Sequence, residues 1–165
     1  MNHPISSTLP DEARDAVAGV LQDTLVDLVD LSLVAKQAHW NLVGRQFHDV
    51  HLHLDELVDT ARNYSDQTAE RCATIGVSPD GRAATVAKST GVPEFPAGWA
   101  SDRDTIRRIF EAVDAVVRRL RPRIDTAGES DPLTEDLLIS AARELEESRW
   151  MWQAQSIGYD QVPAS

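Results

Sequence analysis

The feature that most constrains the fold of this chain is a strict spacing of mostly apolar residues near its start. Between residues 16 and 42 these positions recur at alternating steps of four and three. An α-helix turns once in about 3.6 residues, so such steps keep the positions on one buried face. The positions are Leu21, Leu25, Leu28, Ser32, Ala35, His39 and Leu42. Asp11 and Glu12, which follow Pro10, suit the start of a helix, and Gly44 suits its end.

The same periodicity predicts three more long helices. One runs from about Gln46 to Ile75, one begins after Ser101 as its N-cap, and one opens at Asp131-Pro132 with Glu135 placed for capping. Pro122 predicts a kink or an end of the third helix. The inward positions are Phe47, Val50, Leu54, Leu57, Val58 and Ala61, then Ile106, Ile109, Phe110, Val113, Val116, Val117 and Leu120, then Leu138, Ala141, Ala142, Leu145, Arg149 and Trp152.

A long connection rich in Gly and Pro separates the second and third helices. It spans residues 76–98, with one short helix expected around Arg82 to Lys88. We find no strand-like alternation of useful length. Four helices with one long crossover predict an all-α fold, a ferritin-like four-helix bundle. The predicted organisation is an N-terminal tail over 1–15, the bundle over 16–158 and a short C-terminal tail over 159–165.

Composition removes several classes of function. The chain has 27 acidic and 16 basic residues and a formal charge of −11, which repels DNA phosphates and anionic membranes. Its one cysteine, Cys72, permits no intramolecular disulfide or cysteine zinc cluster and is expected to be a buried apolar residue. No apolar run is long enough to cross a membrane, and Met1 to Glu12 lack the features of a signal peptide. The expected compartment is the cytoplasm.

Motif searches narrow the chemistry further. The chain contains no Gly-rich phosphate loop and no HExxH zinc protease motif. It also contains no Glu-x-x-His, which the usual di-iron site inside a ferritin-like bundle needs on two helices. The ordinary internal site is therefore excluded.

A histidine and carboxylate cluster remains on the first two helices. His39 lies at an inward position of the first helix, and His51–Asp55 and Asp66–Glu70 are i, i+4 pairs on the second. At about 100° per residue, the four residues of the second helix fall within an arc of about 100°. Such a stripe is most often a solvated face, so the alternative is a bundle without a metal site.

The spacing of the two pairs favours a site shared between two chains. Asp55 and Asp66 lie about 16 Å apart along the axis, whereas the ligands of one metal converge to about 2 Å from it. The midpoint of positions 51 and 70 and the midpoint of positions 55 and 66 both fall between Thr60 and Ala61. Two antiparallel copies of this helix, related by a two-fold axis there, would bring the first pair of one chain to the second pair of the other. Imidazoles and carboxylates without a thiolate favour iron, manganese or zinc.

These motifs resemble the ferroxidase signature of the Dps family, the dodecameric mini-ferritins. The matching residues are Lys36-Gln37-Ala38-His39-Trp40-Asn41, then His51-x3-Asp55, then Asp66-x3-Glu70. The resemblance also covers the long middle connection, the Asp-Pro entry to the last helix and Trp150. It implies two iron ions per intersubunit site, with His39, His51 and Asp55 from one subunit and Asp66 and Glu70 from its partner. Asp66 and Glu70 would hold the tighter iron and the histidines the weaker one.

The resemblance also implies an activity and an assembly. Fe(II) would be oxidised, preferably by hydrogen peroxide or else by dioxygen, and stored as ferric mineral in a hollow homododecamer of 23 symmetry, which protects the cell and its DNA. Trp40 and Trp150 match family tryptophans close to this site, where they would quench radicals or pass electrons, although a role as ordinary core aromatics is the alternative. Asp131, Glu135 and Asp136 match the acidic lining of an iron-entry pore, although helix capping explains acids there equally well.

Other features leave alternatives open. A nucleoid-associated protein that shields DNA by direct binding is the second functional hypothesis, but residues 1–15 hold no Lys and the last residues, 157–165, hold no basic residue. His48 and His53 are not family ligands, and His53 could face a storage cavity or simply solvent. The arginines at 118, 119, 121 and 123 are expected to form ion pairs between subunits.

Overall fold

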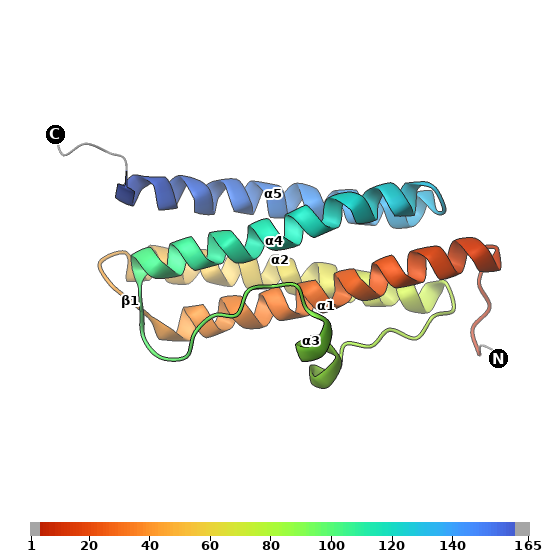
Figure 1. Ribbon diagram of the computed structural model, residues 1–165, viewed down its shortest axis with the longest axis horizontal. Helices are drawn as coiled ribbons and strands as arrows, with labels where there is room; N and C mark the ends of the chain where they lie inside the picture. The colour runs from red at the N-terminus through yellow and green to blue at the C-terminus, as the bar shows by residue number, and fades with distance from the viewer. Residues whose placement is uncertain (1–3, 161–165) are drawn as a thin grey trace.

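Four long helices and one short helix make up the computed structural model, which describes the backbone of residues 4–160 and the side chains of residues 4–157 (Figure 1). The helices are α1 (Asp11–Asn41), α2 (Phe47–Thr74), α3 (Ala83–Ser89), α4 (Asp102–Gly128) and α5 (Pro132–Asp160). The predicted all-α bundle with a short helix between its second and third long helices is confirmed. Within the described residues, no helix is long and apolar enough to cross a membrane.

The bundle consists of two antiparallel helix pairs joined by a crossover. The helix α1 packs on α2, α4 packs on α5, and α1 also packs on α4. The connection from α2 to α4 returns along the length of the bundle, carries α3 on the outside and leaves α2 and α4 parallel (Figure 1). A two-residue parallel pairing joins β1 (Leu42–Val43) to β2 (Ala100–Ser101) and fastens the end of this crossover to the α1–α2 turn.

The predicted stripe is buried at all seven positions, six of them on α1 and the last, Leu42, in β1. In α2 the inward residues are buried except Phe47, which is 44% exposed. Phe47 is the first residue of α2 and lies beyond the end of the core, where its ring stacks against His51 instead. A smaller apolar cluster at the other end of the bundle contains Cys72 with Val17, Leu21 and Ile75, and burial raises the pKa of the Cys72 thiol to about 11.

The helix ends differ from the expected boundaries. The helix α1 begins at Asp11, where the acidic start signal lies, so the helical body starts five residues before position 16, the predicted start of the bundle. The carbonyl of Pro10 accepts the first helical hydrogen bond from Arg14, which also pairs with Asp11. Pro122 does not end α4, which continues to Gly128, and its ring lies on an exposed side of the helix. The predicted C-terminal tail begins inside α5, and its residues 161–165 lie outside the described residues.

Helix capping is confirmed at one predicted position and differs at another. The Ser101 hydroxyl accepts a hydrogen bond from the backbone N–H of Asp104 at 3.1 Å, as expected of an N-cap. At the start of α5 the Asp131 carboxylate accepts the backbone N–H of Thr134, which occupies the third helical position. The capping role expected of Glu135 is therefore wrong, because Glu135 lies one residue too far along.

The α1–α2 turn depends on Gly44. Its φ is +143°, and a Cβ at this position would lie 2.5 Å from the carboxylate of Asp102. That carboxylate accepts the backbone N–H of Gln46 at 2.9 Å, so the turn is tied to the start of α4. Any larger residue at position 44 would push this anchor away.

A buried ion cluster holds the two helix pairs and the crossover together. The carboxylate of Asp27 on α1 is fully buried and pairs with Arg119 at 2.7 Å and Arg123 at 2.8 Å, both from α4. Its other oxygen accepts the backbone N–H of Gly91 in the crossover at 2.9 Å. Arg123 is itself buried, so its charge is balanced chiefly by Asp27.

We expect Asp27→Ala to lower the free energy of unfolding by about 3–5 kcal/mol, because it leaves the buried Arg123 guanidinium without its counter-charge. Asp23→Ala is the matched control, since Asp23 is an exposed aspartate on the same helix, and should change stability by about 0.5 kcal/mol or less. Urea unfolding followed by circular dichroism measures both. Equal losses in the two variants would contradict the central role of the cluster.

Candidate metal centre

Three of the five predicted ligands converge in one chain. His39 comes from the last turn of α1, and His51 and Asp55 come from successive turns of α2. One ligand atom from each lies within 4.8 Å of the others. His39 is buried, whereas His51 and Asp55 are half-buried, so the cluster opens to the surface on one side only. Two imidazoles and a carboxylate at this separation form a donor set that suits iron, manganese or zinc.

The two histidines hold each other in one tautomer. Their rings stack with centroids 3.5 Å apart. The Nδ1 of His39 lies 3.1 Å from the backbone carbonyl of His51, and the Nδ1 of His51 lies 3.2 Å from the carbonyl of His39. A carbonyl oxygen only accepts, so each Nδ1 carries the proton and donates. Each Nε2 therefore keeps its lone pair for a metal, which is the usual arrangement of metal-binding histidines.

Asp55 has a basic neighbour to which the sequence analysis assigned no role. The ammonium of Lys36 donates a very short hydrogen bond to Asp55 Oδ1, and the Nδ1 of His39 lies 3.4 Å from the same oxygen. The hydrogen bond from Lys36 lowers the pKa of Asp55, so the carboxylate is ionised at neutral pH. Lys36 could have been found from its position, because it lies one helical turn before His39 on the same face.

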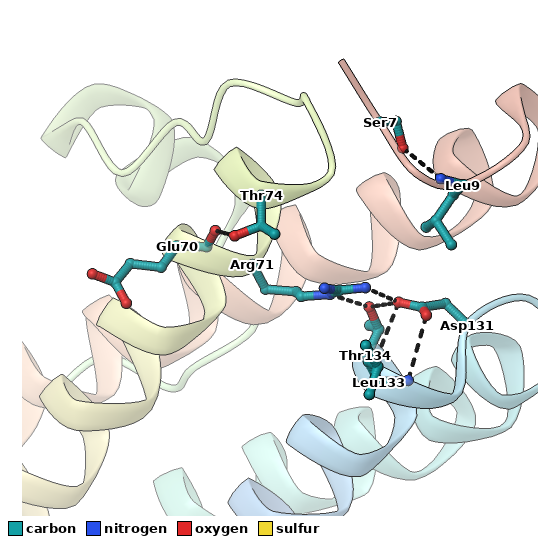
Figure 2. Close-up of polar contacts among 8 residues, drawn as sticks. All are labelled: Ser7, Leu9, Glu70, Arg71, Thr74, Asp131, Leu133 and Thr134. Atoms are coloured by element: carbon teal, nitrogen blue, oxygen red, sulfur yellow. Dashed lines mark hydrogen bonds and ion pairs between the residues drawn. The ribbon is translucent and has the colours of Figure 1, made fainter. Parts of the chain in front are cut away.

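The other two predicted ligands do not reach this cluster within the chain. Asp66 and Glu70 are exposed and lie farther along α2. The carboxylate of Glu70 extends away from the neighbouring polar cluster of Arg71, Asp131 and Thr134 (Figure 2). The separation of about 16 Å expected from helical rise agrees with their absence from the cluster. The two carboxylates thus remain candidates for a site on a second copy of the chain.

Comparison with known proteins identifies the family. A family model described as a ferritin-like domain matches residues 19–156. The DNA protection during starvation protein of Agrobacterium fabrum is 36% identical over 157 residues, which are 92% of this chain and 94% of that protein. A solved structure of Mycobacterium smegmatis Dps has a TM-score of 0.88 at 32% identity and covers 94% of each chain. The chain belongs to the Dps family of ferritin-like proteins.

One further relative bears a different name. The fine tangled pili major subunit of Haemophilus ducreyi is 38% identical over 138 residues, which are 84% of this chain and 73% of that protein. The names of relatives alone therefore do not decide the role of this chain.

The two tryptophans expected near a Dps site are on the surface of the single chain. Trp40 follows His39 and is 65% exposed, and Trp150 on α5 is 64% exposed. The ring contacts recorded for His51 in the described residues come from His39 and Phe47. Proximity of both tryptophans to iron stays a prediction for the assembled protein.

The acidic start of α5 separates into a structural residue and two accessible residues. Asp131 is buried, pairs with Arg71 from α2 and accepts a hydrogen bond from the Thr134 hydroxyl (Figure 2). Its carboxylate thus helps to join α2 to α5. Glu135 is half-buried over Gly128 and Asp136 is exposed. A place for the three residues in an iron-entry pore stays a prediction for the assembled protein.

The surroundings of His53 and of the four arginines between residues 118 and 123 also differ from those expected. His53 does not face open solvent, because its ring stacks on the buried Trp152 with centroids 4.0 Å apart, and burial lowers its pKa. The arginines expected to pair between subunits all pair inside the chain: Arg118 with Asp114, Arg119 and Arg123 with Asp27, and Arg121 with Glu146.

We expect Zn(II) affinity to vary little between pH 8 and pH 7 and to fall only at more acidic pH. Burial lowers the pKa of His39, so its imidazole stays neutral through the neutral range and takes up a proton only at more acidic pH. A proton on the imidazole excludes the metal, so acid weakens binding. Calorimetric titration at each pH measures the affinity, and a steep loss between pH 8 and pH 7 would contradict this protonation state.

Proposed function

We propose that this Dps-family protein is a mini-ferritin that oxidises Fe(II), preferably with hydrogen peroxide, and stores the ferric product inside a hollow homododecamer. The observation that carries the proposal is the convergence of His39, His51 and Asp55, with both Nε2 atoms free to bind. Three ligands that open to the surface form half of a metal site. The remaining ligands would come from Asp66 and Glu70 of a second copy.

The donor chemistry suits iron as the substrate. Carboxylates stabilise Fe(III) more than Fe(II), because the charge that they offset is larger. Two Fe(II) ions beside one peroxide supply the two electrons that reduce it to two molecules of water, and two protons are taken up. No one-electron product such as hydroxyl radical is then released. A site that holds two Fe(II) ions between two chains therefore supplies both of the electrons that one peroxide needs.

A protective role for DNA follows most simply from removal of iron and peroxide. Relatives of this chain are named for DNA protection during starvation. Direct binding to DNA is the alternative, but each copy carries a formal charge of −11, and the densest run of arginines pairs inside the chain. We therefore favour protection of DNA by the removal of iron and peroxide, in the cytoplasm. Glu135 and Asp136 would lie at the iron entry, and Trp40 and Trp150 would lie near the site.

The two-fold arrangement of the site predicts complementation between inactive variants. His51→Ala and Asp66→Ala should each assemble and each slow peroxide-driven iron oxidation severely. If the two variants are co-assembled in equal amounts, about a quarter of the sites combine an intact histidine half with an intact carboxylate half. We expect about a quarter of the wild-type rate, measured by stopped-flow absorbance after addition of Fe(II) and peroxide.

The control is a mixture of the two variants assembled separately, which should stay inactive. Without recovery in the co-assembled protein, the two halves do not belong to one intersubunit site. Wild-type rates in both single variants would overturn the site assignment altogether.

If the protein stores iron, the iron should elute from a size-exclusion column together with the protein. After addition of Fe(II) and peroxide, we expect iron to elute from size exclusion with a particle of about twelve chains. Iron and protein absorbance are recorded in the same run. Precipitated iron beside a monomer or dimer of protein would overturn the storage proposal.

A further inference from the structure

Two opposite charges on the exposed face of α2 have no partner in the described part of the chain. Asp59 and Arg62 are both exposed, and neither side chain forms a salt bridge or hydrogen bond within residues 4–157. Arg71, the only other arginine or lysine of α2, pairs with Asp131. The Arg62 guanidinium is therefore the one arginine or lysine charge of α2 that remains available for a contact outside the chain.

Asp59 and Arg62 lie symmetrically about the proposed ligands. At about 100° per residue, they point about 30° to either side of the mean direction of the four ligands of α2. The midpoint of positions 59 and 62 falls between Thr60 and Ala61, as do the midpoints of both ligand pairs. A two-fold axis that joins the two halves of the metal site therefore also brings Asp59 of each copy beside Arg62 of the other.

The rest of this face supports a second copy of the chain as the occupant. The proposed ligands of α2 include three carboxylates, which would approach those of the second copy and repel them. Two Asp59–Arg62 pairs at the centre would offset this repulsion. Leu52 is 49% exposed, and by the same symmetry it falls opposite Ala69, which is half-buried. Opposite charges and apolar residues thus match across one and the same axis.

We propose that Asp59 and Arg62 form two reciprocal ion pairs across the two-fold axis and thereby set the register of a second copy of the chain on α2. This inference rests on the proposed function, because the same register brings the two halves of the metal site together. Both residues are positioning residues. They bind no metal themselves, and they act by placing the ligands of one copy opposite those of the other.

Charge reversal distinguishes pairs between copies from a pair within one helix. Asp59→Arg alone and Arg62→Asp alone each turn both contacts into repulsion when a variant meets its own kind. In a mixed dimer of the two variants, both contacts again join opposite charges. A pair within one helix, at i, i+3 spacing, would stay broken in the mixture. The matched control is Glu56→Arg, because Glu56 is an exposed carboxylate that points about 90° away from this face.

Assembly is measured by light scattering during size exclusion at several protein concentrations, with EDTA present so that no metal bridges the copies. We expect each single variant to need about tenfold more protein than the wild type for half-maximal assembly. The equal mixture and Glu56→Arg should assemble as the wild type does. The double variant that carries both reversals should do so too, which shows that the substituted helix folds. Wild-type assembly of both single variants, or no recovery in the mixture, would overturn the proposal.

An iron assay on the same samples distinguishes failure of the ion pairs from failure of the proposed function. Each interface that recovers in the mixture contains both ligand halves, so peroxide-driven iron oxidation should recover with assembly. Recovered assembly without iron oxidation would contradict the proposed function and leave the ion pairs in place. Wild-type iron oxidation by both single variants would overturn the ion pairs and leave the proposed function in place.

Discussion

The packing of α1 on α2 determines where every proposed ligand of one chain lies. The two helices are antiparallel, and the turn at Gly44, anchored to Asp102, sets their register. Positions equally distant from this turn face each other, which brings His39 opposite His51 and Lys36 opposite Asp55. A shift by one residue would rotate each of these side chains by about 100° and separate them. The proposed metal site therefore depends first on a backbone turn.

The second helix pair contributes rigidity. Asp27, which is fully buried, joins α1 to α4 and to the crossover, and Asp131 joins the start of α5 to α2 through Arg71. These ion pairs lie along the bundle away from the candidate site. They fix the α1–α2 pair on its support and leave the exposed face of α2, with Asp66 and Glu70, open for a second copy.

Periodicity was sufficient to predict the helices, the crossover and the buried stripe of α1, because burial of a continuous apolar face dominates helix packing. Periodicity failed at Phe47, because the helix extends past the core there and the Phe47 ring stacks on His51 instead. Ligand spacing on α2 also predicted which residues could meet within one chain. It carried no information on contacts across helices, and for this reason the Lys36–Asp55 pair was not predicted.

Charge was harder to interpret from the sequence than apolar pattern. Asp131 and the arginines near 120 had the composition of a pore lining and of an intersubunit contact, yet all of them except Arg118 pair with residues 25 to 96 positions away in the chain. Which acid meets which base depends on the crossing of helices. Only side chains at helical spacing, such as Arg118 and Asp114, could have been paired in advance.

The burial of Cys72 has a consequence if the protein handles peroxide as proposed. Peroxide attacks thiolates, and a thiol with a pKa of about 11 that is sealed in the apolar cluster at one end of the bundle is almost never ionised at neutral pH. The chain thus keeps its single thiol protonated and unreactive toward peroxide. Repeated exposure to the oxidant should leave the polypeptide itself intact at that residue, so that durability comes from the fold and needs no repair.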